Sequence, residues 1–199
     1  MVEHTIYINL EKRTDRKIDI EKELSDNSIV AERYNAIYTP GCGAIGCSYS
    51  HLNVLKMAKE RGYKNILILE DDFTFTVSKD EFHRQLATFF ELNIPFDVCM
   101  ISYNLREGTE TPYPFLIKAN TSYTTSGYIV NQHYYDVLIN ALEWSTPLLE
   151  KTQEHWNYAC DHIYTILQKQ GIWYCLHPRL GKQKSGYSDN CERYCEYDC

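Results

Sequence analysis

The pattern of apolar and polar positions divides the chain into alternating strands and helices. Residues 5–10 alternate and favour a strand, and the apolar run 66–69 is typical of a strand buried on both faces of a parallel sheet. Apolar-face positions recur at helical spacing in residues 51–58, which predicts a helix over residues 46–61. Further strands are expected at 96–101, 127–130 and 172–176, and further helices at 11–23, 79–92, 132–142 and 153–170.

Strands that alternate with helices indicate an α/β protein with an open, mostly parallel twisted sheet and helices on both faces. Residues 1–185 fit a single domain, and residues 186–199 form a cysteine-rich C-terminal tail with little apolar content. Ligands of such sheets bind beyond the carboxyl ends of the strands. The residues that directly follow strands are therefore the first candidates for chemistry.

Composition and charge narrow the function classes. Hydrophobic residues make up 44% of the chain and charged residues 24%, which excludes disorder, coiled coil and collagen. The net charge of −7 argues against a nucleic-acid surface.

The longest apolar run, residues 66–69, is far shorter than the roughly 18 residues that a membrane span needs. The first residues lack the pattern of a secretory signal. We therefore expect no membrane span and a cytoplasmic protein, or a lumenal one if the sequence is a fragment.

Three acidic residues, Glu70, Asp71 and Asp72, directly follow the apolar run 66–69. Because alternate side chains of an extended segment point the same way, Glu70 and Asp72 are expected to converge on one cation, with Asp71 on the other side. Mg²⁺ and Mn²⁺ prefer such oxygen ligands and commonly share them with a diphosphate. A solvated turn is the competing interpretation.

Arg13 and Arg16 lie one helical turn apart, just after the first predicted strand. Two guanidinium groups at this spacing can clamp phosphate oxygens or stack on a base, with Asp15 orienting one of them. An exposed first helical turn with ordinary charge pairs is the alternative.

The segment GCSYSH at residues 46–51 opens a predicted helix. The free N–H groups and the dipole of a helix N-terminus favour an anion, and Ser48 and Ser50 add hydroxyl donors. A buried core histidine with satisfied hydrogen bonds is the alternative for His51.

Taken in order, three motifs resemble glycosyltransferase family 25, which contains the lipooligosaccharide galactosyltransferases and the related collagen galactosyltransferases. The motifs are INLEKRTDR at residues 8–16, GCSYSH at 46–51 and LEDD at 69–72. A patchier likeness continues at 125–128 and 178–189.

The resemblance implies a GT-A fold and a metal-dependent inverting glycosyltransferase. The enzyme would move galactose, glucose or N-acetylglucosamine from a UDP-sugar to a hydroxyl of a protein or glycan acceptor, with Mn²⁺ or Mg²⁺ bound. The residues implied to surround the nucleotide and its diphosphate are Asn9, Leu10, Arg13, Arg16, Ser50, His51 and Asp71, and the implied metal ligands are Glu70 and Asp72.

Two further roles rest on residues outside these motifs. Inversion requires a general base near the acceptor hydroxyl, and Asp161 on a predicted helix is the candidate, with Glu154 in reserve. A late histidine completes the metal shell in many GT-A enzymes, and His177, just after the last predicted strand, is the candidate for that ligand. A solvated helix-surface carboxylate and a rigid exit turn with Pro178 are the structural alternatives.

Two other functions fit parts of the same sequence. A non-catalytic sugar-nucleotide-binding or assembly module of the same fold would keep the donor pocket without turnover. An aspartyl phosphotransferase would use Asp72 as a covalently phosphorylated nucleophile, because residues 72–77 partly imitate the nucleophile loop of haloacid-dehalogenase-like enzymes.

The cysteines of the tail leave three alternatives open. Cys191, Cys195 and Cys199 are spaced by four, so a helical tail would align them on one face. They can bind a metal, join two chains into a homodimer by disulfides, or pair with Cys42 or Cys47.

Overall fold

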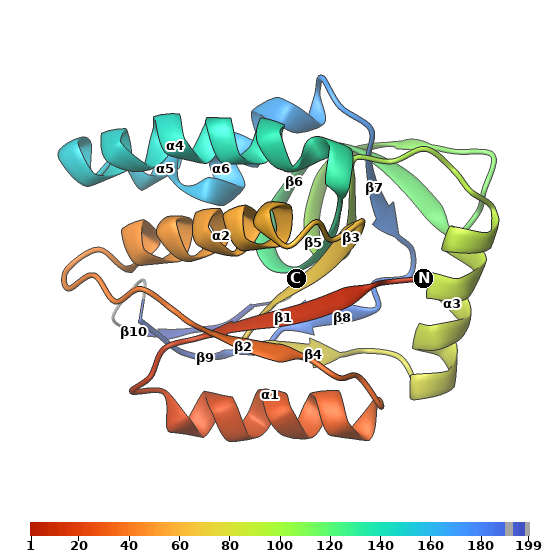
Figure 1. Ribbon diagram of the computed structural model, residues 1–199, viewed down its shortest axis with the longest axis horizontal. Helices are drawn as coiled ribbons and strands as arrows, with labels where there is room; N and C mark the ends of the chain where they lie inside the picture. The colour runs from red at the N-terminus through yellow and green to blue at the C-terminus, as the bar shows by residue number, and fades with distance from the viewer. Residues whose placement is uncertain (190–192, 198–199) are drawn as a thin grey trace.

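The computed structural model describes residues 1–189 and 193–197 of the chain. Within these residues, six strands form the main sheet in the order β2-β1-β3-β6-β5-β7 (Figure 1). These strands are β1 (His4–Asn9), β2 (Glu32–Asn35), β3 (Asn65–Glu70), β5 (Val98–Glu110), β6 (Leu116–Asn131) and β7 (Trp173–Leu176). All but β6 run in one direction, since β6 is antiparallel to both β3 and β5. The predicted open, mostly parallel α/β sheet is confirmed.

Helices cover both faces of this sheet, as predicted. They are α1 (Thr14–Asp26), α2 (Gly43–Glu60), α3 (Lys79–Glu91), α4 (Tyr135–Thr152), α5 (His155–Tyr158), α6 (Cys160–Gln168) and the 3₁₀ turn η1 (Gln132–Tyr134). Helices α2, α4 and α6 pack on one face, and α1 and α3 pack on the other (Figure 1).

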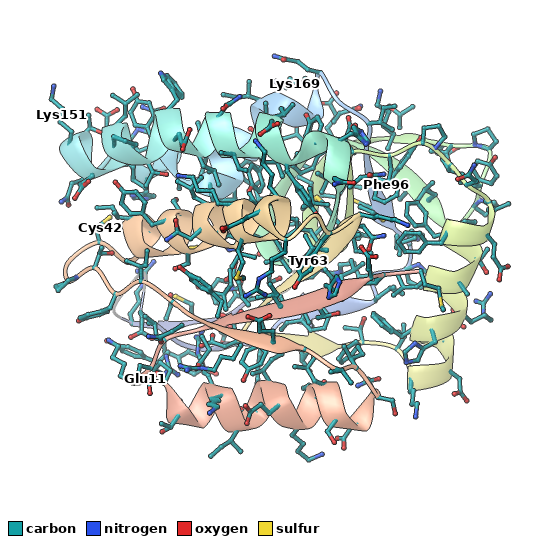
Figure 2. The ribbon with its side chains drawn as sticks, viewed as in Figure 1. Glu11, Cys42, Tyr63, Phe96, Lys151 and Lys169 are labelled. Atoms are coloured by element: carbon teal, nitrogen blue, oxygen red, sulfur yellow. The ribbon has the colours of Figure 1, made fainter. Side chains whose placement is uncertain are left out.

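The two cores follow from the alternation of side chains along the strands. In β3, Ile66 and Ile68 point into the core under α2, whereas Leu67 and Leu69 point into the core under α1 and α3. All four are essentially inaccessible to solvent, which explains why the sequence of this strand is continuously apolar. Side chains fill the space between the sheet and the helices on both faces, while Lys151 and Lys169 project outward from the layer of α4 and α6 (Figure 2).

The sequence analysis did not predict five of the short or polar strands. Strand β2 carries the polar sequence ERYN at the edge of the main sheet. Strands β4 (Phe73–Phe75) and β8 (Gly181–Gln183) pair with each other, as do β9 (Gly186–Ser188) and β10 (Arg193–Cys195). Three-residue strands show too few alternations to be recognised, because their pairing depends on a partner far away in the chain.

Three other expectations need correction. Strands β5 and β6 extend well beyond the predicted segments 96–101 and 127–130. The helix predicted over 153–170 is broken into α5 and α6 at Ala159, whose backbone is extended. The condition for aligning the tail cysteines on one face, a helical tail, is not met at Cys195, which lies in β10, while Cys191 and Cys199 lie outside the described residues.

None of the helices in residues 1–189 and 193–197 combines the length and the apolar character needed to cross a membrane.

The start of α2 is fixed by a close approach of the preceding loop. A Cβ atom at Gly46 would lie 2.2 Å from the carbonyl oxygen of Ile37, and the Gly46 N–H donates to Thr39 Oγ1 at 2.8 Å. Glycine is therefore required at this position so that the loop between β2 and α2 can lie against the first turns of the helix.

Replacing Gly46 by alanine is expected to destabilise the protein. The contact is with backbone, which cannot move aside as a flexible side chain can, so the overpacking should reduce the free energy of unfolding by about 1–3 kcal/mol. Urea denaturation measures the effect. Gly186→Ala is the matched control, because a Cβ there meets no atom within 4 Å. Equal midpoints for the two variants would contradict this account of the loop.

Candidate functional site

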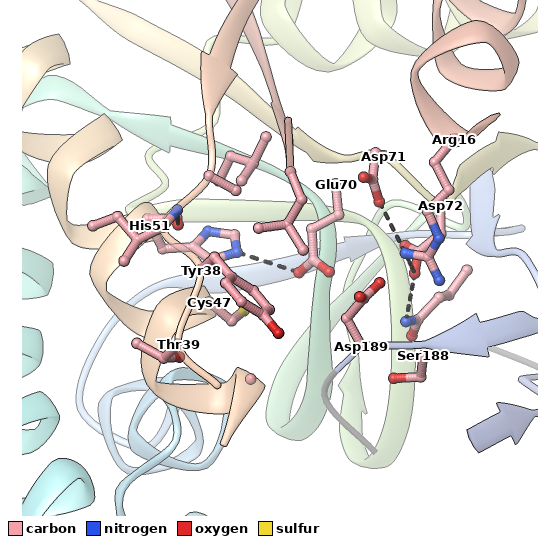
Figure 3. Close-up of a pocket in the computed structure, with 17 residues that line it drawn as sticks. Arg16, Tyr38, Thr39, Cys47, His51, Glu70, Asp71, Asp72, Ser188 and Asp189 are labelled. Atoms are coloured by element: carbon pink, nitrogen blue, oxygen red, sulfur yellow. Dashed lines mark hydrogen bonds and ion pairs between the residues drawn. The ribbon is translucent and has the colours of Figure 1, made fainter. Parts of the chain in front are cut away.

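A pocket opens beyond the carboxyl ends of β1 and β3, where α/β sheets bind ligands. We call it the central pocket (Figure 3). The sequence-predicted residues that line it are Leu10, Arg16, Ser50, His51, Glu70, Asp71 and Asp72. Three distant motifs of the sequence therefore meet at one place in the fold.

Arg16 holds two of the acidic side chains. Its Nη1 atom donates to Asp71 Oδ1 at 2.9 Å and to Asp72 Oδ2 at 3.0 Å (Figure 3). Its Nη2 atom donates to the carbonyl oxygen of Tyr187 at 2.7 Å. The expectation that Asp71 faces away from Asp72 is wrong. The chain turns directly after Glu70, so the alternation of an extended strand no longer applies.

Glu70 has a different set of partners. Its Oε1 atom lies 3.2 Å from His51 Nε2 and accepts a hydrogen bond from Thr125 Oγ1 at 2.5 Å. The other ring nitrogen of His51 contacts the hydroxyl of Tyr128 at 2.8 Å. Although burial alone would raise it, the pKa of Glu70 is lowered, because the His51 hydrogen bond and charge favour the carboxylate.

Of the three acids, Asp72 lies in the environment least favourable to its ionised form. Burial and the nearby charge of Glu70 raise its pKa to about 7, and the attraction of Arg16 only partly opposes this rise. Its Oδ2 atom also accepts from Gln183 Nε2 at 3.1 Å, whereas Oδ1 is buried without a hydrogen-bond partner among the described residues. A buried carboxylate oxygen of this kind suits a hard divalent cation.

Arg13 and Asn9 brace the same region from outside the lining of the central pocket. Asn9 Nδ2 donates to Asp71 Oδ2 at 2.8 Å and to the carbonyl oxygen of Arg13 at 3.1 Å. Asp15 orients Arg13 through two hydrogen bonds of 2.8 and 2.9 Å, as the sequence predicted. Arg13 also donates to Asp189 at 2.5 Å.

The two arginines expected to clamp phosphate are thus engaged by carboxylates of the chain itself. Asp189 ends the segment 178–189 of the patchier family likeness, but the sequence analysis assigned no role to this residue. It also forms an ion pair with Lys12 at 2.8 Å and lines the central pocket with Ser188. These contacts leave the central pocket a volume of only about 90 Å³.

Ser50 acts on the loop rather than on an anion. Its hydroxyl donates to the carbonyl oxygen of Gly46 at 2.6 Å and accepts from the N–H of Ile37 at 2.8 Å. It thereby holds the loop that brings Tyr38 and Thr39 to the central pocket. No local pattern in the sequence indicates that this loop forms a wall of the site.

A second and larger hollow, the side pocket, adjoins the first. Its volume is about 690 Å³, it is lined by Thr125, Cys160 and Asp161, and it shares Cys47, Glu70 and Gln183 with the central pocket. Burial raises the pKa of Asp161, whose Oδ1 atom accepts from the N–H of His162 at 2.9 Å.

The structure does not bring Glu154 and His177 into this arrangement. Glu154 is absent from the lining of both pockets and accepts a hydrogen bond from Asn157 Nδ2 at 2.8 Å. His177 is exposed and lines a separate surface pocket beside α3, and its N–H donates to the carbonyl oxygen of Phe115. His177 follows β7, three strands away from β3, so the expectation that it joins Glu70 and Asp72 is corrected.

Removal of the Arg16 charge should destabilise the fold in a pH-dependent way. Arg16→Met leaves two buried carboxylates without their counter-charge, which should lower the free energy of unfolding by about 3–5 kcal/mol near pH 8. Burial raises the pKa values of Asp71 and Asp72 above those of the unfolded chain, so the folded variant binds protons at a higher pH than the unfolded variant does. The loss of free energy of unfolding caused by Arg16→Met should therefore shrink as the pH falls towards about 5.

Denaturation across this pH range measures the effect. Arg84→Met removes a solvent-exposed ion pair with Glu81 and should change stability by less than about 1 kcal/mol. A loss for Arg16→Met that stays constant or grows as the pH falls would show that the two carboxylates are not its cause.

Comparison with known proteins identifies the family. Residues 41–150, more than half of the chain, match the sequence profile of glycosyltransferase family 25 (LPS biosynthesis protein). A search of curated protein sequences finds no match.

Solved structures share the fold at low sequence identity. One is a glycosyltransferase involved in the glycosylation of the major capsid of PBCV-1, with a TM-score of 0.53 and 14% identity over 88% of this chain and 81% of that one. Another is the apo-form glycosyltransferase GlyE of Streptococcus pneumoniae TIGR4, with a TM-score of 0.51 and 12% identity over 89% of this chain and 46% of that one. The predicted GT-A type of sheet is thus confirmed, and the family match shows that this chain belongs to glycosyltransferase family 25.

Proposed function

We propose that the protein is a metal-dependent inverting glycosyltransferase that moves a hexose from a UDP-sugar to an acceptor hydroxyl. The observation that carries the proposal is the position of Glu70, which closes β3 between the central pocket and the side pocket and lines both. A transferase needs donor and acceptor to meet at one point, and Glu70, the first residue of the acidic triplet, lies at the junction of the two pockets.

The nucleotide diphosphate is assigned to the central pocket. Arg16 supplies a cationic group there, and Arg13 lies behind Asp189, which lines the pocket. The exposed ring of Tyr38 lies beside Lys12, whose Nζ is 3.9 Å from the ring centre. A UDP-sugar needs far more room than the central pocket now offers, since ligand pockets usually measure about 300–1,000 Å³. The donor would therefore displace Ser188 and Asp189, with its phosphates replacing the Asp189 carboxylate at Arg13.

Glu70 and Asp72 are the candidate ligands for Mn²⁺ or Mg²⁺. The buried, unpartnered Oδ1 atom of Asp72 supports this assignment, and Glu70 stays ionised because of its contact with His51. The bound cation would neutralise the negative charge that develops on the leaving diphosphate. Arg16 meanwhile keeps Asp71 and Asp72 in place.

The acceptor is assigned to the side pocket. Its volume of about 690 Å³ fits a sugar or a modified side chain of a protein. Asp161 lines this pocket, and its raised pKa suits a group that takes a proton from the acceptor hydroxyl as the new bond forms. Galactose is the first donor sugar to test, because it is the sugar implied by the resemblance, followed by glucose and N-acetylglucosamine.

Calorimetry of UDP binding tests the donor assignment. We expect UDP to bind and Mn²⁺ to strengthen the binding. Asp72→Ala should abolish the Mn²⁺ effect because it removes a proposed ligand oxygen, whereas Asp80→Ala, which removes an exposed carboxylate of α3, should preserve it. Absence of heat with any UDP species, with or without Mn²⁺, would refute the proposed function.

Turnover of UDP-sugars tests the role of Asp161. Asp161→Asn should retain UDP affinity but lower the rate of sugar transfer or release by about 10²–10⁴-fold, the usual contribution of a positioned general base. Asp136→Asn, which alters an exposed carboxylate on α4, serves as the control. Equal rates for the two variants would remove Asp161 from the mechanism. UDP binding by a wild-type chain that never releases sugar would instead indicate the non-catalytic module.

A further inference from the structure

Two cysteines and a histidine meet in the wall between the central pocket and the side pocket. Cys47 and His51 are four residues apart on α2 and so share one face of that helix, and Cys160 is the first residue of α6. Their sulfur and ring-nitrogen atoms all lie within 4.8 Å of one another. His51 and Cys160 are buried and Cys47 is half-buried.

This donor set differs in chemistry from the carboxylates of the proposed Mn²⁺ site. Thiolate and imidazole ligands favour Zn²⁺, whereas carboxylate oxygens suit Mg²⁺ and Mn²⁺. Zinc binds sulfur at about 2.3 Å and nitrogen at about 2.0–2.1 Å, so ligand atoms of a tetrahedral site are on the order of 3.5 Å apart. The cluster thus needs a contraction of roughly 1 Å, which side-chain rotation can supply.

The ring of His51 is already oriented. The Tyr128 hydroxyl lies 2.8 Å from Nδ1 and Glu70 Oε1 lies 3.2 Å from Nε2. Histidine ligands of metals commonly bond through their second nitrogen to a neighbour that fixes the ring. With Nε2 on the metal, the Tyr128 hydroxyl holds Nδ1, and the three protein ligands leave the fourth position of a tetrahedral zinc site to a water or an added ligand.

We propose that Cys47, His51 and Cys160 form a zinc site with three protein ligands. Binding converts both thiols to thiolates and releases two protons, with no change of oxidation state. Zinc binding itself requires no sugar transfer. One consequence does rest on the proposed function: with Nε2 on zinc, His51 would lose its contact with Glu70, a proposed ligand of the donor metal, and transfer would be inhibited.

Titration of the full-length protein with Co²⁺ under reducing conditions tests the site. We expect a thiolate-to-cobalt charge-transfer absorption band, which one equivalent of Zn²⁺ removes and Mn²⁺ does not. Cys47→Ser and Cys160→Ala should each weaken the band, because one thiolate remains, and the double variant should lose it. Cys99→Ala, which removes a buried thiol from the opposite face of the sheet, should retain it.

Three outcomes would overturn the proposal. They are no charge-transfer band in the wild type, a band of full intensity in both Cys47→Ser and Cys160→Ala, and a band that Mn²⁺ removes as readily as Zn²⁺. Circular dichroism of each variant distinguishes a lost ligand from a lost fold, and His51→Gln gives a second test if Cys160→Ala does not fold. The readout involves neither UDP nor sugar, so its failure would leave the UDP calorimetry unaffected.

Discussion

The arrangement of the site depends on one buried interaction, the guanidinium of Arg16 between the carboxylates of Asp71 and Asp72. Three acids in a row at the end of an apolar strand would otherwise repel one another in a medium that solvates them poorly. Arg16 compensates two of them, and His51 compensates the third, Glu70, from the opposite side. The division of partners orients Glu70 towards α2 and Asp71 and Asp72 towards α1.

The framework of the fold could be predicted from the sequence because its signals are local. The continuous apolar run of β3, the helical repeat in α2 and each of the three motifs lie within short stretches of the sequence. The convergence of these motifs also follows, since the carboxyl ends of β1 and β3 adjoin in a parallel sheet. Strand β4 was missed because it is short and pairs with β8, a hundred residues later.

The details of the site depend on contacts that no local pattern encodes. Alternation along a strand predicts the direction of Asp71 only while the strand continues, and the chain turns at this residue. The contact of Asp189 with Arg13 joins residues 176 positions apart, and Cys160 meets Cys47 only because α6 packs beside α2. His177 was chosen from its place after the last strand, but that strand lies at the far side of the sheet.

Contacts of the tail and of the cysteine cluster would affect donor binding and metal binding at the site, respectively. Asp189 engages the cations that a diphosphate would use, so donor binding and tail contact would exclude each other. Glu70, a proposed ligand of the donor metal, also contacts His51 of the cysteine cluster. A metal bound at the cluster would therefore influence metal binding at Glu70 and Asp72, and the reverse.

Crystals grown with Mn²⁺ and UDP, with data collected at the manganese absorption edge, offer the most direct measurement of the central claim. The account predicts an anomalous peak in contact with Asp72 and Glu70, with the diphosphate in the central pocket and Asp189 displaced from Arg13. A nucleotide bound elsewhere, or a manganese peak that touches neither Asp72 nor Glu70, would contradict it.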